Sequence, residues 1–168
     1  MKILLYFEKE EKIKTSGIGR ALRHQIAALT SAGIEYTLNP KDTYDIAHIN
    51  TYFPHSKRLL KRLKRKHIPV IVHGHSTIED FKNSFRLWKL MAVWFNPNLM
   101  YFYKHADLII TPTEYSKRCI DAYKLGTEVR YVSNGIDSKE YAYDEAKIEA
   151  FKKHFDIKDG EKVIIKIH

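Results

Sequence analysis

The chain has 168 residues, of which 44% are hydrophobic and 29% charged, as in a soluble protein with one domain or one domain plus part of another. Its single cysteine, Cys119, excludes an internal disulfide, argues against a cysteine-based zinc site and fits a reducing compartment. The formal net charge of +9 favours a polyanionic partner, which is a nucleic acid, an anionic membrane surface or a phosphate-bearing substrate.

Short β-branched runs alternate along the chain with segments of helical periodicity. The predicted strands are residues 2–7, 34–38, 46–49, 69–72, 108–110, 128–132 and 162–167. The predicted helices are residues 16–32, with Ser16 as N-cap, then 54–66, 114–124 and 144–155, while 81–103 is a long aromatic-rich segment. This alternation predicts an α/β domain with a Rossmann-like parallel sheet flanked by helices. We expect residues 1–155 to form it, and residues 156–168 to be a linker and the first strand of a missing second domain.

A glycine loop opens the first predicted helix. Gly17 and Gly19 allow backbone N–H groups to approach an anion at the helix N-terminus, and Arg20 adds a positive charge. The third glycine of the dinucleotide fingerprint is replaced by Leu22, so this is not a clean NAD site. A phosphate-facing loop and a plain loop-to-helix junction both remain open.

Two histidines and two hydroxyl side chains follow the predicted strand 69–72: His73, His75, Ser76 and Thr77. Ligands of open parallel sheets bind beyond the carboxyl ends of the strands, so these are candidate site residues, although a plain polar loop is the alternative. Because side chains alternate along a strand, we expect His73 to point elsewhere if His75 faces the cleft. No carboxylate or thiol stands at metal-binding spacing, so a hydrogen bond to a substrate hydroxyl is favoured over a metal.

A basic helix and an aromatic segment suggest a membrane surface. The basic candidates are Lys57, Arg58, Lys61, Arg62, Lys64 and Arg65, and the aromatic ones are Trp88 and Trp94. A merely solvated helix face and core packing of the aromatic residues are the alternatives. Nucleic-acid binding is a third, but no recognised module is present. The aromatic segment is too short and too interrupted to span a bilayer.

The chain resembles the retaining glycosyltransferases of family four, which have the GT-B fold. The resemblance is carried by residues 16–20, 45–48, the strand ending at His75, and residues 106–114 and 133–137. Finer features at 16–25, 47–54 and 73–81 resemble bacterial glucosyltransferases that extend glucosyl-diacylglycerol. The resemblance covers essentially the whole chain, as the N-terminal, acceptor-side half of such an enzyme.

The resemblance implies transfer of a hexose, expected to be glucose, from a UDP-sugar to a membrane glycolipid or diacylglycerol, with retention at the anomeric carbon. It implies no metal or other cofactor, and a cytoplasmic enzyme bound peripherally to the inner leaflet. The fragment alone is expected to be inactive, because the donor-binding half is missing. A soluble sugar or cell-wall acceptor stays open, as does a non-enzymatic module that binds nucleic acid, which we do not expect.

The resemblance also assigns roles to single residues. His75 is the expected catalytic residue, through a hydrogen bond to the transferred sugar. The loop expected at the donor phosphates or the acceptor consists of Gly17, Ile18, Gly19 and Arg20. The expected acceptor cleft contains His73, Ser76, Thr77, Asn50, Thr113 and Lys117, and the expected cleft loop contains Asn134 and Gly135.

Overall fold

The structure is a computed structural model that describes residues 1–9, 11, 16–82, 88–135, 142–158 and 160–164. The chain divides into two compact units, Met1–Gly135 and Ile136–His168, which are considered separately. The boundary predicted from the sequence lies after residue 155, and that domain assignment stays a prediction.

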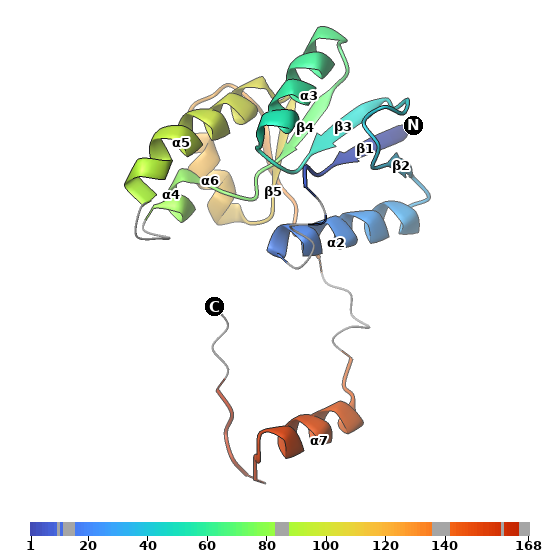
Figure 1. Ribbon diagram of the computed structural model, residues 1–168, viewed down its shortest axis with the longest axis vertical. Helices are drawn as coiled ribbons and strands as arrows, with labels where there is room; N and C mark the ends of the chain where they lie inside the picture. Colours follow the sequence, from blue (N-terminus) through green and yellow to red (C-terminus); the bar gives the residue numbers. More distant parts are fainter. Residues whose placement is uncertain (10, 12–15, 83–87, 136–141, 159, 165–168) are drawn as a thin grey trace. The chain divides into compact units, whose positions relative to one another are not determined.

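The first unit is built on a six-stranded sheet in the order β2-β1-β3-β4-β5-β6 (Figure 1). The strands are β1 (Lys2–Tyr6), β2 (Glu35–Thr37), β3 (Ile46–Ile49), β4 (Val70–His73), β5 (Leu108–Thr111) and β6 (Val129–Tyr131). Every neighbouring pair is parallel, which confirms the predicted fold class. The chain leaves β1 for β2 and returns to β3 on the other side, so the strand order reverses between β1 and β3. Ligands of such sheets bind at the carboxyl ends near this reversal.

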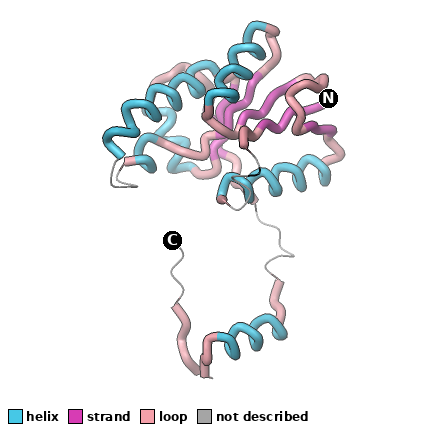
Figure 2. Tube along the Cα trace, in the orientation of Figure 1, coloured by secondary structure: helices cyan, strands magenta, loops and turns pink. Residues whose placement is uncertain are grey.

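Helices cover both faces of the sheet (Figures 1 and 2). They are α2 (Gly17–Ser31), α3 (Pro54–Arg65), α4 (Ile78–Phe81), α5 (Trp88–His105) and α6 (Glu114–Ala122). Helix α2 packs Leu22 against Leu5 of β1. On the opposite face Leu60 of α3 and Phe102 of α5, both fully buried, pack against Val72 in a larger core. The stripe of leucines inside the basic helix α3 is therefore what holds that helix on the sheet.

Local sequence signals explain where the helices begin. The Ser16 side chain accepts a hydrogen bond from the Gly19 N–H at 3.3 Å, which confirms the predicted N-cap of α2. Pro54 is the first residue of α3, a position at which its missing N–H leaves no intrahelical hydrogen bond unmade. Helix α5 starts at Trp88, later than the predicted aromatic segment, and continues through Pro97.

The second unit contains α7 (Glu145–His154), capped by Asp144, whose carboxylate accepts from the Lys147 N–H at 3.1 Å. The predicted polar helix 144–155 is thus confirmed. The predicted strand 162–167 is wrong for residues 162–164, which belong to no strand, and residues 165–167 lie outside the described part. Backbone pairing decides this difference, because a β-branched run becomes a strand only beside a partner strand.

Candidate active site

Polar side chains gather at the carboxyl edge of the sheet, beside the reversal of strand order. His48 of β3 lies opposite Leu5 in the strand register, so both point to the face that α2 covers. His73, the last residue of β4, lies on the same face, since it follows Ile71, the partner of His48, by two positions. Helix α2 adds the Gln25 side chain, which reaches Asn50 just after β3.

Three imidazole rings form a stack at this edge. The His73 and His75 ring centroids are 4.0 Å apart with planes 25° from parallel, and the His48 and His73 centroids are 5.2 Å apart at 28°. The expectation that His73 and His75 point to different sides is therefore wrong. Strand β4 ends at His73, so Gly74 is outside the strand and the chain turns, which carries the His75 ring over its neighbour.

A hydrogen-bond network joins the stack to two amides. Asn50 and Gln25 pair reciprocally, with the Gln25 Nε2 donating to Asn50 Oδ1 at 2.9 Å and the Asn50 Nδ2 to Gln25 Oε1 at 3.2 Å. The Nε2 of His75 lies 3.0 Å from the same Asn50 Oδ1. The Nδ1 of His73 lies 3.3 Å from Gln25 Nε2 and 3.2 Å from His48 Nε2.

Burial keeps all three rings neutral. Removal from water lowers the pKa of His48 to about 3, of His73 to about 4 and of His75 to about 2. Charge repulsion from His73 adds to the lowering at His48 and at His75. A group with a pKa this far below neutrality is a poor general base, because proton transfer is most effective when the pKa lies near the working pH. The stack is therefore suited to hydrogen bonding.

The backbone that carries His75 is held from several sides. The Tyr52 hydroxyl donates to the His73 carbonyl and accepts from the His75 N–H, the latter at 3.1 Å. Tyr103 donates to the Ser76 carbonyl at 2.5 Å and Thr111 to the Gly74 carbonyl at 3.1 Å. Burial raises the pKa of Tyr52 to about 12, so its hydroxyl keeps the proton that it donates. This is a fixed platform for the imidazole.

Several residues of the expected acceptor cleft have local structural roles. Thr77 is fully buried and forms a capping box with Asp80 at the start of α4. Thr113 caps α6 through the Ser116 N–H at 3.0 Å, and Lys117 pairs with Asp121 of the same helix at 2.5 Å. Asn50, by contrast, touches His75 directly.

The cleft loop and the glycine loop differ in how they relate to the stack. The Asn134 side chain acts on the His73 ring and partly raises its pKa against the effect of burial, and Gly135 has a positive φ of 70°. Gly17, Ile18, Gly19 and Arg20 form the first turn of α2, the helix that supplies Gln25. Gly19 is buried and Arg20 is exposed, and a Cβ on Gly17 would meet no atom within 4 Å.

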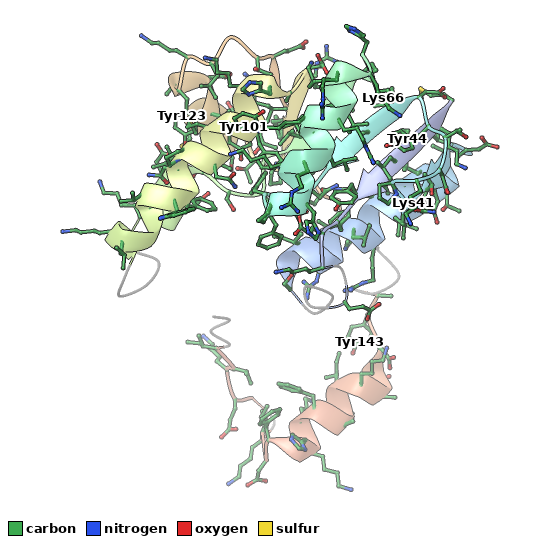
Figure 3. The ribbon with its side chains drawn as sticks, turned by 45° about the horizontal axis from the view of Figure 1, so that its top comes forward. Lys41, Tyr44, Lys66, Tyr101, Tyr123 and Tyr143 are labelled. Atoms are coloured by element: carbon green, nitrogen blue, oxygen red, sulfur yellow. The ribbon has the colours of Figure 1, made fainter. Side chains whose placement is uncertain are left out.

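An apolar groove with a cationic edge lies between α3 and α5. It has a volume of about 1020 Å³ and is lined by Tyr52, Phe53, Pro54, Lys57, Arg58, Lys61, Leu90, Val93, Trp94, Phe95, Pro97, Asn98 and Tyr101. Leu90 and Trp94 are 71% and 84% exposed, an unusual state for large apolar side chains. The Lys57 ammonium lies 4.3 Å from the centre of the Tyr101 ring and 3.2 Å from Asn98 Oδ1. Tyr101, on α5, is labelled in Figure 3.

The other predicted membrane-surface residues are distributed differently. Lys64 does not line this groove. Its ammonium is paired with Asp107 at 2.6 Å. Arg62 and Arg65 line a second, smaller hollow of about 470 Å³, which Arg58 shares. Trp88 begins α5, and its side chain lies outside the described part. The groove therefore combines four of the predicted residues: Lys57, Arg58, Lys61 and Trp94.

Sequence reasoning did not find four side chains of the site: Gln25, His48, Tyr52 and Tyr103. Alternation along the predicted strand 46–49 could have indicated His48, which lies two residues before Asn50 on the same face. No sequence signal identifies Tyr52 or Tyr103 as backbone-holding residues among the 11 tyrosines of the chain.

Among the residues that the structure describes, no three or more His, Cys, Asp or Glu side chains are arranged to hold a metal, and no helix has the length and apolar character needed to cross a membrane.

The chain is similar to known glycosyltransferases in sequence and in fold. The family described as "Glycosyltransferase Family 4" matches residues 38–140, more than half of the chain. The processive diacylglycerol alpha-glucosyltransferase of Acholeplasma laidlawii is 49% identical over 166 residues, which are 98% of this chain and 49% of that protein. The chain thus spans about half the length of this relative.

The fold is similar to that of HepE from Anabaena, solved in complex with UDP-glucose, with a TM-score of 0.61 at 14% identity. The same protein in complex with UDP and glucose gives a TM-score of 0.58 at 15% identity. Each match covers 93% of this chain and 50% of the solved chain. The six-stranded unit therefore corresponds to one half of a GT-B glycosyltransferase.

Proposed function

Because the chain belongs to glycosyltransferase family 4, we propose that it is the acceptor-side half of an enzyme that transfers glucose to diacylglycerol or a glucosylated diacylglycerol. The observation that carries the proposal is the 49% identity to a processive diacylglycerol alpha-glucosyltransferase along nearly the whole chain. The HepE complexes with UDP-glucose and with UDP and glucose support a UDP-sugar as donor.

The apolar groove between α3 and α5 is the proposed lipid contact. Exposed Leu90, Val93 and Trp94 offer an apolar wall to acyl chains, and Lys57, Arg58 and Lys61 offer cations to anionic headgroups. Basic residues near an anionic membrane surface contribute about 1 kcal/mol each to binding. We therefore propose that the enzyme is bound peripherally to a membrane through this groove.

His75 is the proposed catalytic residue. A neutral imidazole at the carboxyl edge of the sheet, held by Asn50 and by the Tyr52 hydroxyl, can hydrogen-bond a hydroxyl of the transferred sugar. The proposal includes retention at the anomeric carbon and no metal. The leaving diphosphate would then be stabilised by helix N-termini and cationic side chains, which need no reorganisation as charge develops. The donor would be bound mainly by the half outside this chain.

A chimeric enzyme tests the proposal. The chain replaces the matching half of the Acholeplasma laidlawii relative, and the hybrid receives radiolabelled UDP-glucose with diacylglycerol in vesicles that contain anionic lipid. We expect labelled glycolipid from the hybrid, none from the remaining half alone, and at least a tenfold loss in His75→Ala. The hybrid with Arg58→Glu and Lys61→Glu should bind anionic vesicles less tightly but keep its activity on acceptor in detergent micelles. Transfer only to soluble sugars would reject the lipid acceptor, and no transfer from any nucleotide sugar would reject the proposal.

A further inference from the structure

The donors and acceptors of the hydrogen-bond network around the histidine stack can be assigned from one backbone carbonyl. The carbonyl of His48 can only accept, so the Asn50 atom that faces it at 3.5 Å is the Nδ2. The Asn50 Oδ1 is therefore an acceptor, and both groups that approach it must donate: the Nε2 of Gln25 and the Nε2 of His75. One backbone carbonyl thus fixes where the proton of the His75 ring lies.

The donor and acceptor roles of the next ring in the stack follow from the same assignment. Since the Gln25 Nε2 is a donor, the His73 Nδ1 beside it must be the acceptor. The His48 Nε2 lies 3.2 Å from the same Nδ1, whose single lone pair the Gln25 donor already uses. His73 and His75 consequently both have the proton on Nε2. The His73 Nε2–H is left without a hydrogen-bond acceptor of normal geometry among the described residues, although the ring is only 3% exposed.

The assignment also identifies which ring nitrogen of His75 is left for a ligand. With the Nε2–H of His75 bound to Asn50, the ring's remaining polar atom is the unprotonated Nδ1. In the part of the chain that the structure describes, this Nδ1 has no hydrogen-bond partner. The site therefore presents a lone pair, which can accept from a hydroxyl group but cannot bind a carbonyl oxygen or a phosphate oxygen.

We propose that Asn50 and Gln25 are positioning residues that lock His75 in the Nε2–H tautomer, so that its Nδ1 accepts a hydrogen bond from a sugar hydroxyl. Asn50 supplies the acceptor, and Gln25 holds the Asn50 amide in the necessary orientation through their reciprocal pair. The locking part stands on the network alone, whereas the sugar as the source of the hydroxyl rests on the proposed function.

Nitrogen NMR of the ¹⁵N-labelled 168-residue chain tests the locking directly, because the two ring nitrogens of each histidine report the tautomer. We expect a single Nε2–H tautomer for His75 in the unsubstituted protein, and the Nδ1–H form there would overturn the proposal. In Asn50→Leu, which preserves shape, a second His75 tautomer should appear. In Asn50→Asp, which keeps the acceptor, the single tautomer should persist.

Further variants separate locking from folding. Gln25→Met should loosen the tautomer of His75 less than Asn50→Leu does, while Asn39→Leu, on a distant loop, should leave the ring signals unchanged. An unchanged single tautomer in folded Asn50→Leu and Gln25→Met would overturn the role of both amides. If Asn50→Leu does not fold, the unsubstituted protein and Gln25→Met still decide the matter.

The hydroxyl is tested with octyl glucoside below its micelle concentration. We expect the Nδ1 signal of His75 to move on titration while the Nε2 signal stays bound to Asn50. Movement of the Nε2 signal, or no movement of either nitrogen, would reject the sugar hydroxyl as the ligand. This outcome is distinct from failure of the proposed function, which the chimera decides by glucose transfer.

Discussion

Acid should destabilise the first unit steeply through its three buried histidines. Each has a native pKa below the ordinary value: about 3 for His48, about 4 for His73 and about 2 for His75. An unfolded histidine titrates at about 6.5, so between about pH 6 and pH 4 the unfolded chain binds three protons that the native protein does not. Stability must therefore fall as the pH is lowered through this window, and the slope from these groups fades out only above the unfolded pKa, at about pH 7.5.

The magnitude follows from proton linkage. Each proton bound only by the unfolded state changes the free energy of unfolding by about 1.4 kcal/mol per pH unit, so three together give about 4 kcal/mol per pH unit near pH 5. A domain of this kind has only about 5–15 kcal/mol of stability in total. Counted from the unfolded pKa of about 6.5, this slope removes about 6 kcal/mol by pH 5 and about 10 kcal/mol by pH 4, so a unit of about 5–10 kcal/mol should unfold about two to three pH units below neutrality.

Urea unfolding followed by circular dichroism between pH 7 and pH 4.5 measures the slope. His48→Gln keeps a polar side chain beside His73 but cannot titrate, and should lower the slope by about 1.4 kcal/mol per pH unit. His154→Gln, on exposed α7, is the matched control. Equal slopes for His48→Gln and the unsubstituted protein would show that His48 is protonated normally, and would refute the explanation of the stack as three neutral rings.

Three further predictions concern the support of the site, each measured as the free energy of unfolding in urea. Gly74→Ala should lower the free energy of unfolding by about 1–3 kcal/mol, because the added Cβ would lie 3.0 Å from the Ile120 Cδ1. An unchanged free energy would mean that Ile120 of α6 moves aside at no cost. Tyr52→Phe keeps the ring but loses the hydroxyl that holds the strand end, and should lose about 1–3 kcal/mol, while the same change at Tyr143, which is 80% exposed, should lose nothing. Glu8→Ala removes the carboxylate that accepts from the first turn of α3 at 2.7 Å and should lose about 1–2 kcal/mol, whereas a similar loss in Glu8→Gln would argue against its role as an acceptor.

The sheet was predictable because its signals are local. Alternating β-branched runs and amphipathic segments identify the strands and helices of the first unit, and Ser16 marks the start of α2 through its own side chain. The run at residues 162–164 has the same local signal but forms no strand, since a strand also depends on a partner strand, which local sequence does not reveal.

The site was predictable only in part. The position of His75 after a strand places it at the edge of the sheet where the other histidines and amides gather, and Asn50 touches it. The stacking of His73 on His75 was not predictable by alternation, because Gly74 ends the strand between them. Gln25 reaches the site from a helix 25 residues before Asn50, and only the packed fold brings the two amides together.

Tyr52 belongs to two parts of the molecule at once. Its ring lines the groove between α3 and α5, and its hydroxyl holds the backbone on both sides of Gly74. We therefore expect the two walls of the groove to differ in how well they tolerate substitution. For the proposed lipid contact, we expect the exposed outer positions Leu90, Val93 and Trp94 to tolerate substitution and to determine which alkyl chains fit, while position 52 requires both a ring and a hydroxyl. Changing the range of lipids under this proposal would mean varying the outer wall and keeping Tyr52.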